Sequence, residues 1–298
     1  MSPDFVHLHT HSSYSPMWGT STLEALCEAV RSQGHDTFAL TDTNGLYGAI
    51  RFLEVAKRAG LKPILGTEII QAQHRAVLLA KSPEGYGNLC RLLSARHEDE
   101  PFEFIETLQR YRSGLVILSD DFQALTAWRA QSGEDLYVEL TPGADLQKAV
   151  SFSRQNSIPP VATTRAALLR PTDFEAHRLL RAIAENTTLS RLRPDCCCAP
   201  SHWLMPSSVM ARALPHVPEA LSNTRRIANQ CATAWDFQTT IFPSFREMSA
   251  DGAVATLRAK TYNGAVWRYG VLSEVVRARI KKELTVIREK RFADYFLV

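Results

Sequence analysis

A histidine-rich stretch near the N-terminus constrains this chain more than any other feature. Residues 5–19, called here the histidine stretch, read F-V-H-L-H-T-H-S-S-Y-S-P-M-W-G, with His7, His9 and His11 at every second position. The apolar residues around them are typical of a short strand, in which residues two apart share a face. Two imidazoles on one face can begin a divalent-metal site. The pattern therefore favours a metal site that includes His7 and His9 over histidines that only cap a core or meet solvent.

The residues that follow alternate between short apolar runs and helical patterns. Strands are predicted at 37–41, 62–66, 74–80, 114–118, 135–140 and 160–163, mostly with amphipathic helices between them. This alternation predicts parallel βαβ units. Because about six or seven such units close more naturally into a barrel than into an open sheet, the sequence predicts an α/β barrel.

Residues of metal-ligand type lie at the ends of several predicted strands. Barrels carry their chemistry at the carboxyl ends of their strands. The residues found there are His7, His9, Asp42, Glu68, Glu139 and Thr164. The sequence contains no glycine-rich phosphate loop and no G-x-S-x-G motif. Position and residue type together predict metal-dependent chemistry.

The sequence changes character after residue 173. Helices are predicted at 174–185, 219–231, 253–268 and 274–290, with a linker at 243–251. Residues 254–298 contain ten Lys/Arg and four Asp/Glu, so this segment has a charge of +6 while the whole chain has +3. Such a segment can meet nucleic acid, but charge alone favours a solvated helical face. The chain stops at an apolar run, residues 296–298, which suggests an interrupted domain.

Composition places the chain among ordinary globular proteins. Its 298 residues are 45% hydrophobic and 22% charged, and no apolar run reaches the length of a membrane span. The N-terminus does not resemble a signal peptide, so a cytoplasmic location is predicted. The consecutive Cys196, Cys197 and Cys198 are interpreted as loop thiols rather than metal ligands, because adjacent side chains diverge and no second C-x-x-C is present.

Several strings in the chain together resemble one family. They are V-H-L-H-T-H-S-S-Y-S, A-L-T-D, G-L-K-P-I-L-G-T-E and V-A-T-T. They resemble the polymerase-and-histidinol-phosphatase (PHP) domain, and more narrowly that domain at the N-terminus of the bacterial DNA polymerase III alpha subunit, a C-family polymerase. The strings that favour the polymerase version span residues 44–52, 84–89, 218–224, 283–287 and 292–297. The resemblance covers nearly the whole chain.

The resemblance implies a fold and a division of the chain. The fold is a distorted (β/α)7 barrel of the PHP type, followed by a helical C-terminal segment. Residues 1–238 would be the PHP domain, a barrel plus a helical extension, and residues 239–298 a linker and the start of the polymerase palm region. Family members bind up to three ions, usually zinc, manganese or iron. They are phosphoesterases, and in some polymerases the domain is a 3′–5′ exonuclease, whereas in others it is only structural.

The resemblance also implies which residues match the metal ligands of the family and at which positions a ligand residue is missing. The residues that match metal ligands are His7, His9, Asp42, Glu68, His74 and Glu139. The degenerate ligand positions are Trp18, Thr43, Arg165 and Ala167. Arg165 is expected to neutralise Asp42 or Glu68 and to fill the space of a metal. We therefore expect one weakly held divalent ion (Zn, Mn or Fe) near His7, His9 and Glu68, or none.

Three functions are compatible with these residues. The favoured one is the PHP part of a DNA polymerase III alpha subunit, which supports DNA-template-directed DNA synthesis with a degenerate phosphoesterase or exonuclease site. Its partners would be the remainder of the polymerase, other replisome subunits and, through the full-length enzyme, DNA; no membrane is implicated. The family places the polymerase catalytic aspartates beyond residue 298, so no catalytic residue is named. The alternatives are an independent metal-dependent phosphoesterase, either a 3′–5′ exonuclease or histidinol-phosphatase-like, and a non-enzymatic interaction module.

Overall fold

The structure is a computed structural model that describes residues 5–98, 102–143, 145–237 and 244–298. The chain divides into two compact units, Met1–Trp235 and Asp236–Val298, and each is described by itself. The predicted boundary between residues 238 and 239 lies outside the described residues. The assignment of the two parts to a PHP domain and to the start of a palm region stays a prediction.

The first unit is built on one sheet of six strands in the order β1-β2-β3-β4-β5-β6. These strands are β1 (Thr37–Leu40), β2 (Lys62–Gln71), β3 (His74–Ala80), β4 (Leu115–Ser119), β5 (Leu136–Leu140) and β6 (Pro160–Ala162). The pairs β1–β2, β4–β5 and β5–β6 are parallel. All six strands lie where the apolar runs predicted them.

Strand β3 is the exception to the parallel arrangement, since it is antiparallel to both β2 and β4. Only Ala72 and Gln73 separate β2 from β3. A link of two residues closes a hairpin and is too short for the helical crossover that parallel strands need. The hairpin also extends β2 beyond its predicted end, as far as Gln71, which pairs with His74. The first residues of β3 therefore lie at the same end of the sheet as the last residues of its neighbours β2 and β4.

The histidine stretch joins the two edges of the sheet, although it is not a regular strand. On one side the Ala39 amide of β1 donates to the His7 carbonyl at 2.8 Å. On the other side the Ala166 amide donates to the His9 carbonyl at 3.0 Å, and the His11 amide donates to the Ala166 carbonyl at 2.8 Å. The stretch therefore lies between β1 and the segment that follows β6. This arrangement agrees with the predicted barrel of PHP type.

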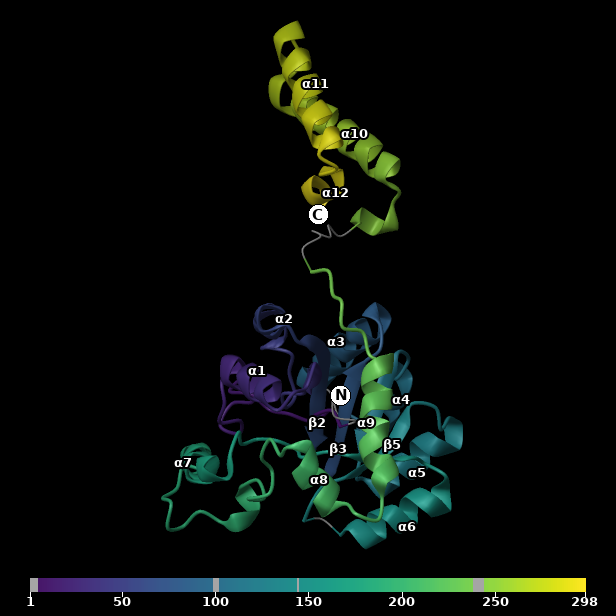
Figure 1. Cartoon of the computed structure of the whole chain (residues 1–298). Coiled ribbons are helices and arrows are strands. Elements are labelled where there is room, and N and C mark those ends of the chain that lie inside the picture. The colour runs from purple at the N-terminus through teal and green to yellow at the C-terminus, as the bar shows by residue number, and fades with distance from the viewer. Residues whose placement is uncertain (1–4, 99–101, 144, 238–243) are drawn as a thin grey trace. The chain divides into compact units, whose positions relative to one another are not determined.

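Helices cover the outside of the curled sheet (Figure 1). They are α1 (Leu23–Ser32), α2 (Ala49–Ala59), α3 (Pro83–His97), α4 (Phe104–Tyr111), α5 (Phe122–Gln131), α6 (Leu146–Asn156) and α9 (Pro218–Gln230). Helix α2 packs on β2, α5 and α6 pack on β5, and α9 packs on β6. The largest fully buried side chain is Trp128 of α5, whose Nε1 donates to the Ile105 carbonyl at 3.0 Å. Two further helices, α7 (Phe174–Ala184) and α8 (Ser207–Ala213), lie in the segment after β6.

The second unit is helical, as predicted for the C-terminal segment. It contains α10 (Ala250–Tyr269), α11 (Glu274–Glu289) and α12 (Ala293–Leu297). The side chains of Ser249 and Ser273 cap α10 and α11 at their N-termini. No helix within the described residues combines the length and the apolar character that crossing a bilayer requires.

Candidate metal centre

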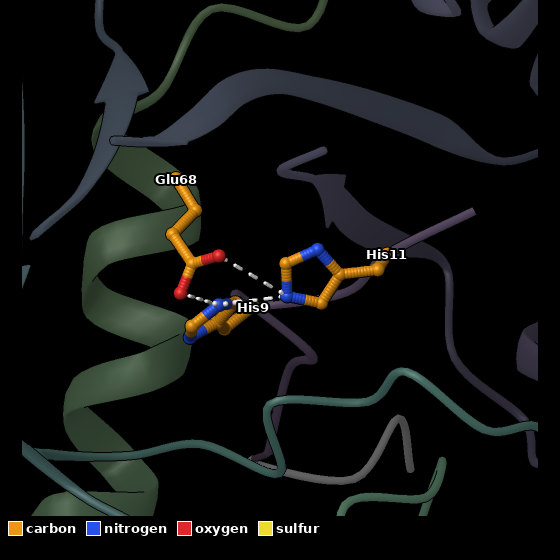
Figure 2. Close-up of side chains that lie close together, drawn as sticks. All are labelled: His9, His11 and Glu68. Atoms are coloured by element: carbon orange, nitrogen blue, oxygen red, sulfur yellow. Dashed lines mark hydrogen bonds and ion pairs between the residues drawn. The ribbon is translucent and has the colours of Figure 1, made fainter. Parts of the chain in front are cut away.

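Three side chains converge inside the first unit in a geometry that fits a metal ion (Figure 2). The Nε2 atoms of His9 and His11 are 3.1 Å apart, and Glu68 oxygens lie 3.4 Å from His9 Nε2 and 3.7 Å from His11 Nε2. Within the described residues these form the one group of three ligand-type side chains whose ligand atoms all lie within 4.8 Å of one another. All three are buried. Two imidazoles and one carboxylate are a ligand set of hydrolytic zinc sites, so these residues fit one divalent ion.

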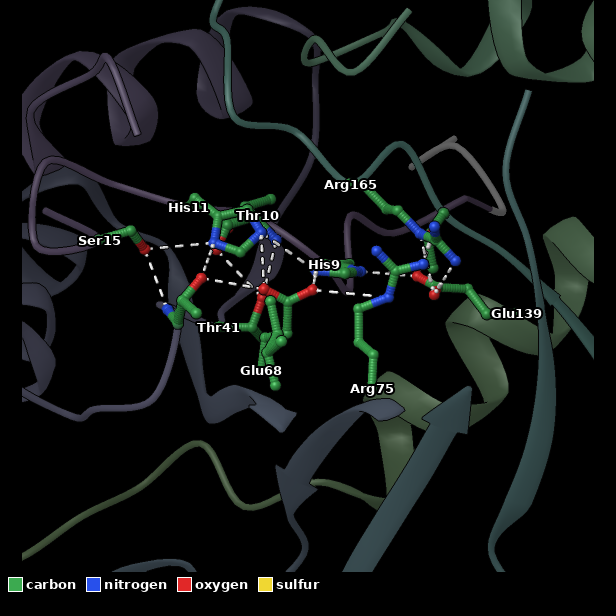
Figure 3. A network of polar contacts seen from close by, with 12 residues as sticks. His9, Thr10, His11, Ser15, Thr41, Glu68, Arg75, Glu139 and Arg165 are labelled. Atoms are coloured by element: carbon green, nitrogen blue, oxygen red, sulfur yellow. Dashed lines mark hydrogen bonds and ion pairs between the residues drawn. The ribbon is translucent and has the colours of Figure 1, made fainter. Parts of the chain in front are cut away.

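A second buried acid, Glu139 of β5, is saturated by protein donors (Figure 3). Its Oε1 lies 2.6 Å from His9 Nδ1 and accepts from Thr163 Oγ1 at 2.6 Å. Its Oε2 accepts from Arg165 Nε at 3.1 Å and from Arg165 Nη2 at 2.7 Å. Arg165 Nη2 also lies 2.8 Å from Asp120 Oδ2. Arg165 thus holds the carboxylate that the sequence assigned to a metal.

The partners of Arg165 differ from the prediction. We expected it to neutralise Asp42 or Glu68, but it pairs with the acids at the ends of β4 and β5, because it lies three residues after the end of β6, the strand next to β5. A different arginine, Arg75 at the start of β3, has its Nε 3.9 Å from Glu68 Oε1. Arg75 Nη2 also lies 2.9 Å from Asp120 Oδ2. Two guanidinium groups therefore share one centre.

The contacts of the two central histidines define their protonation. His11 Nδ1 faces the hydroxyl oxygens of Ser15 at 3.2 Å and Thr43 at 3.3 Å, which assigns its proton to Nδ1 and leaves the Nε2 lone pair toward His9. Burial lowers the pKa of His11 to about 3, against the charge of Glu68. Burial also opposes a charge on His9, but the charge and hydrogen bond of Glu139, with help from Glu68, outweigh it and raise the pKa of His9. The raised pKa favours a second proton on His9, at the Nε2 atom where a metal would bind.

The charges of this centre balance without a metal. The cations are His9, Arg75 and Arg165, and the anions are Glu68, Glu139 and Asp120. Burial penalises the ionised carboxylates, but the neighbouring cations prevail: His9 and the charges around it lower the pKa of Glu68 to about 2, and Arg165 and His9 hold the pKa of Glu139 well below its usual range. This partly buried cluster thus contains as many anionic as cationic groups when His9 is protonated.

Asp42 is separated from His11 of the candidate centre by one intervening residue, Ser15. Its Oδ1 accepts from the Ser12 amide at 2.7 Å and from Ser15 Oγ at 2.6 Å, and its Oδ2 accepts from Ser12 Oγ at 2.8 Å. Burial raises the pKa of Asp42, and these three hydrogen bonds oppose the rise. Asp42 thus anchors a turn within the histidine stretch and is linked to His11 through Ser15.

His7 and His74 lie away from the centre. The His7 ring packs against His35, with ring centroids 5.1 Å apart, and its Nε2 is 3.3 Å from Gln33 Oε1. The structure does not place His7 on the face of His9, because the stretch lacks the regular alternation of a strand. His74 Nδ1 lies 2.5 Å from Asp121 Oδ2, and its ring stacks on Phe104. Ligand roles for His7 and His74 stay predictions without support from this geometry.

The degenerate ligand positions have other structural roles. Ala167 is buried in an apolar cluster with Leu168 and Cys198, and Trp18 packs against that cluster. The Thr43 hydroxyl donates to Glu68 Oε2 at 2.9 Å. These positions therefore contribute packing and hydrogen bonds, and none of them offers a metal ligand.

Comparison with known proteins agrees with this geometry. Residues 7–140 match the PHP domain family. These residues are a PHP domain. The chain is 29% identical to an error-prone DNA polymerase of Symbiobacterium thermophilum over 99% of this chain and 31% of that protein. It is 29% identical to a DNA polymerase III subunit alpha of Halalkalibacterium halodurans over 98% of this chain and 29% of that protein.

The chain thus spans about 30% of the length of these curated relatives. It is homologous to the part of the alpha subunit that contains the PHP domain. Among solved structures, a two-domain protein of Bacteroides vulgatus with a predicted PHP-like metal-dependent phosphoesterase is similar at 13% identity and a TM-score of 0.42. That similarity covers 74% of this chain and 63% of the other.

Sequence reasoning missed several residues at or near this candidate centre. It left His11 out of the ligand set and did not select Arg75, Asp120 or His202. Asp120 directly follows β4, so the rule that chemistry lies at the carboxyl ends of strands could have found it. Arg75 could have been found only by recognising the β2–β3 hairpin, which brings the start of β3 to that end. Burial, followed by the charges of Arg165 and His9, lowers the pKa of His202 to about 4.

A buried histidine beside Trp18 should make the stability of the first unit depend on pH. The two ring nitrogens of His177 lie 2.8 Å from the Trp18 carbonyl and 2.9 Å from the Cys198 amide, so Nδ1 donates and Nε2 accepts. Burial lowers the pKa of His177 below its ordinary value. The folded state therefore binds this proton less well than the unfolded state, and stability present above pH ~6.5 should be lost as the pH falls, by at most about 1.4 kcal/mol per pH unit.

Urea unfolding of the wild type and of His177→Gln at pH 7.5 and pH 5.0 measures this contribution. The wild type should lose more stability than the variant between the two pH values. Equal losses in the two proteins would show that another group is responsible.

Proposed function

We propose that this chain is the PHP part of a bacterial C-family DNA polymerase III alpha subunit and that it supports DNA-template-directed DNA synthesis structurally. The similarity to polymerases over nearly the whole chain supports the family context. The observation that supports a structural rather than a catalytic role is Arg165, which is only 9% exposed and binds Glu139 and Asp120. The partners would be the rest of the polymerase, DNA and other replisome subunits, in the cytoplasm.

The proposed state of the centre holds at most one divalent ion. His9, His11 and Glu68 would bind it, and such an ion supplies Lewis-acid chemistry and an activated water when bound. Binding requires His9 to release its Nε2 proton, so metal competes with a proton whose pKa the neighbouring carboxylates raise. His11 is already neutral and presents its lone pair. The competition predicts weak, pH-dependent occupancy.

A second candidate function is that of a metal-dependent phosphoesterase. The convergence of His9, His11 and Glu68 favours it, because three protein ligands with an open position are typical of catalytic zinc sites. The engagement of Glu139 by Arg165 opposes it, since a second ion would need that carboxylate. We infer that full multinuclear chemistry does not operate in this chain.

Elemental analysis of protein purified without chelator tests the proposal. We expect less than one equivalent of zinc, manganese and iron combined per chain. We also expect the release of phosphate from a chromogenic phosphoester to be the same with and without added Mn²⁺. The matched variant His9→Gln/His11→Gln should abolish any residual metal. Two or more tightly bound ions, or a Mn²⁺-dependent rate that the double variant loses, would overturn the structural role and establish the phosphoesterase.

A further inference from the structure

A groove between two helices of the second unit collects basic side chains. It has a volume of ≈ 330 Å³ and lies between α10 and α11, with Ala293 of α12 at its edge. Three of its lining residues are cations, namely Arg258 of α10 and Lys281 and Arg288 of α11. The other lining residues are apolar or are Tyr262 and Thr285. We propose that this groove binds the phosphodiester backbone of nucleic acid.

The three cations reach the groove because of their helical spacing. Lys281 and Arg288 are seven residues apart, about two turns or roughly 10 Å along one face of α11. Arg277, four residues before Lys281, extends the same stripe. Arg258 approaches from the facing helix, with its guanidinium over the Tyr262 ring at 5.7 Å from the centroid. Cationic residues from two helices therefore line one groove.

The charge of this groove is not compensated by nearby acids. Among the described residues that line it none is acidic, and no carboxylate of the described chain lies within 4.0 Å of the charged groups of Arg258, Lys281 or Arg288. By contrast, Arg279, on another face of α11, pairs with Glu283 at 2.6 Å. Like charges held around one hollow repel each other, so a bound polyanion would be favoured there. Charge alone had favoured a solvated face, and the structure adds the convergence that this expectation lacked.

Phosphate is the anion that these side chains suit. The planar fork of arginine donates two parallel hydrogen bonds to a phosphate, and two of the three cations are arginines. A backbone with one charge per nucleotide can engage all three and release condensed counterions on binding. The choice of nucleic acid over an acidic protein rests on the proposed function, since the relatives are DNA polymerases.

Fluorescence anisotropy with the full chain tests the proposal. The probes are labelled duplex DNA of about 20 base pairs, the matching single-stranded DNA and RNA, and polyglutamate, each titrated between 50 and 200 mM salt, where phosphate contacts have their effect. The test variant is Arg258→Gln/Lys281→Gln/Arg288→Gln. The matched control is Arg31→Gln/Arg110→Gln/Arg154→Gln, which removes the same charge from exposed positions of the first unit. Circular dichroism verifies that both variants retain their helices.

The test variant should bind nucleic acid at least tenfold more weakly than the wild type. Its logarithmic salt dependence should also be shallower, by roughly 0.7–0.9 for each phosphate that it no longer neutralises. The control should remain within about threefold of the wild type. Equal weakening in test and control variants would mean that only net charge matters, and equal competition by polyglutamate would indicate an acidic protein partner; either result overturns the proposal. The RNA and DNA arms identify which backbone is preferred. Metal content is a separate readout, so this test and that of the proposed function can fail independently.

Discussion

Replacing Arg165 with methionine is expected to lower the free energy of unfolding by about 3–5 kcal/mol, because it leaves the buried Glu139 carboxylate without its arginine partner. Arg165 makes two hydrogen bonds to Glu139, which is 2% exposed, and one contact to Asp120. Methionine keeps much of the side-chain volume, so the loss reports the charge rather than a cavity. Urea denaturation at pH 7.5 measures the effect.

Two further variants separate the ion pair from general effects of the substitution. Arg154→Met removes an exposed arginine of α6 and should change stability by no more than about 0.5 kcal/mol. Glu139→Gln in the Arg165→Met background removes the stranded charge and should restore part of the loss, since the two residues are in contact. An Arg165→Met protein as stable as the wild type would contradict this ion network.

The fold was predictable because each of its elements carries a local signal. Apolar runs bounded by turns located all six strands, and the alternation with helices indicated the α/β class. The orientation of β3 was not predicted, although the two residues between β2 and β3 carried the information. The sequence also did not predict that the histidine stretch joins the two edges of the sheet, because this depends on backbone hydrogen bonds between residues more than 150 positions apart.

The sequence predicted several residues of the candidate centre but not how their side chains pair. His9, Glu68 and Glu139 were selected from strand ends, and the structure brings them together. The direction of the His7 side chain could not be predicted from the sequence, since side chains two residues apart share a face only in a regular strand. The partners of Arg165 were not readable either, because they depend on which strands are neighbours. Ion pairing across a barrel is a property of topology, and no local pattern in the sequence encodes it.

These details explain how a metal centre can become structural without leaving a cavity. The Arg165 guanidinium binds the Glu139 carboxylate, and Nε2 of His9 faces His11 and Glu68. Ala167 belongs to an apolar cluster. If these positions belonged to a metal-ligand set, as we propose, each change would replace a metal–ligand bond by a hydrogen bond, an ion pair or packing. Under the proposed structural role, the centre would stabilise the barrel by itself, and folding would not require a metal.

Reversing these changes is expected to restore metal binding. In the variant Arg165→Asp/Ala167→His/Thr43→His, the apparent affinity for Mn²⁺ or Zn²⁺ should rise on the order of 100-fold, because ligands replace the competing cation and surround Glu68 and Glu139. Without metal the variant should be less stable than the wild type, since the new carboxylate at position 165 would lie beside the acids Glu139 and Asp120. Metal that binds only the folded state should then raise its melting temperature with concentration. Calorimetric titration and thermal unfolding measure the two effects.

The matched control for this restoration is Arg165→Asn/Ala167→Gln/Thr43→Gln, which makes changes of similar size at the same positions without metal-ligating carboxylates or imidazoles. Ala167 is 1% exposed and packs near Trp18, so both triple variants must enlarge the same apolar site and should share that part of the destabilisation. Only the ligand-bearing variant should be stabilised by metal, and more strongly as the pH rises and His9 loses its proton. If the metal affinity of this variant equals that of the control, positions 43, 165 and 167 do not belong to the ligand set.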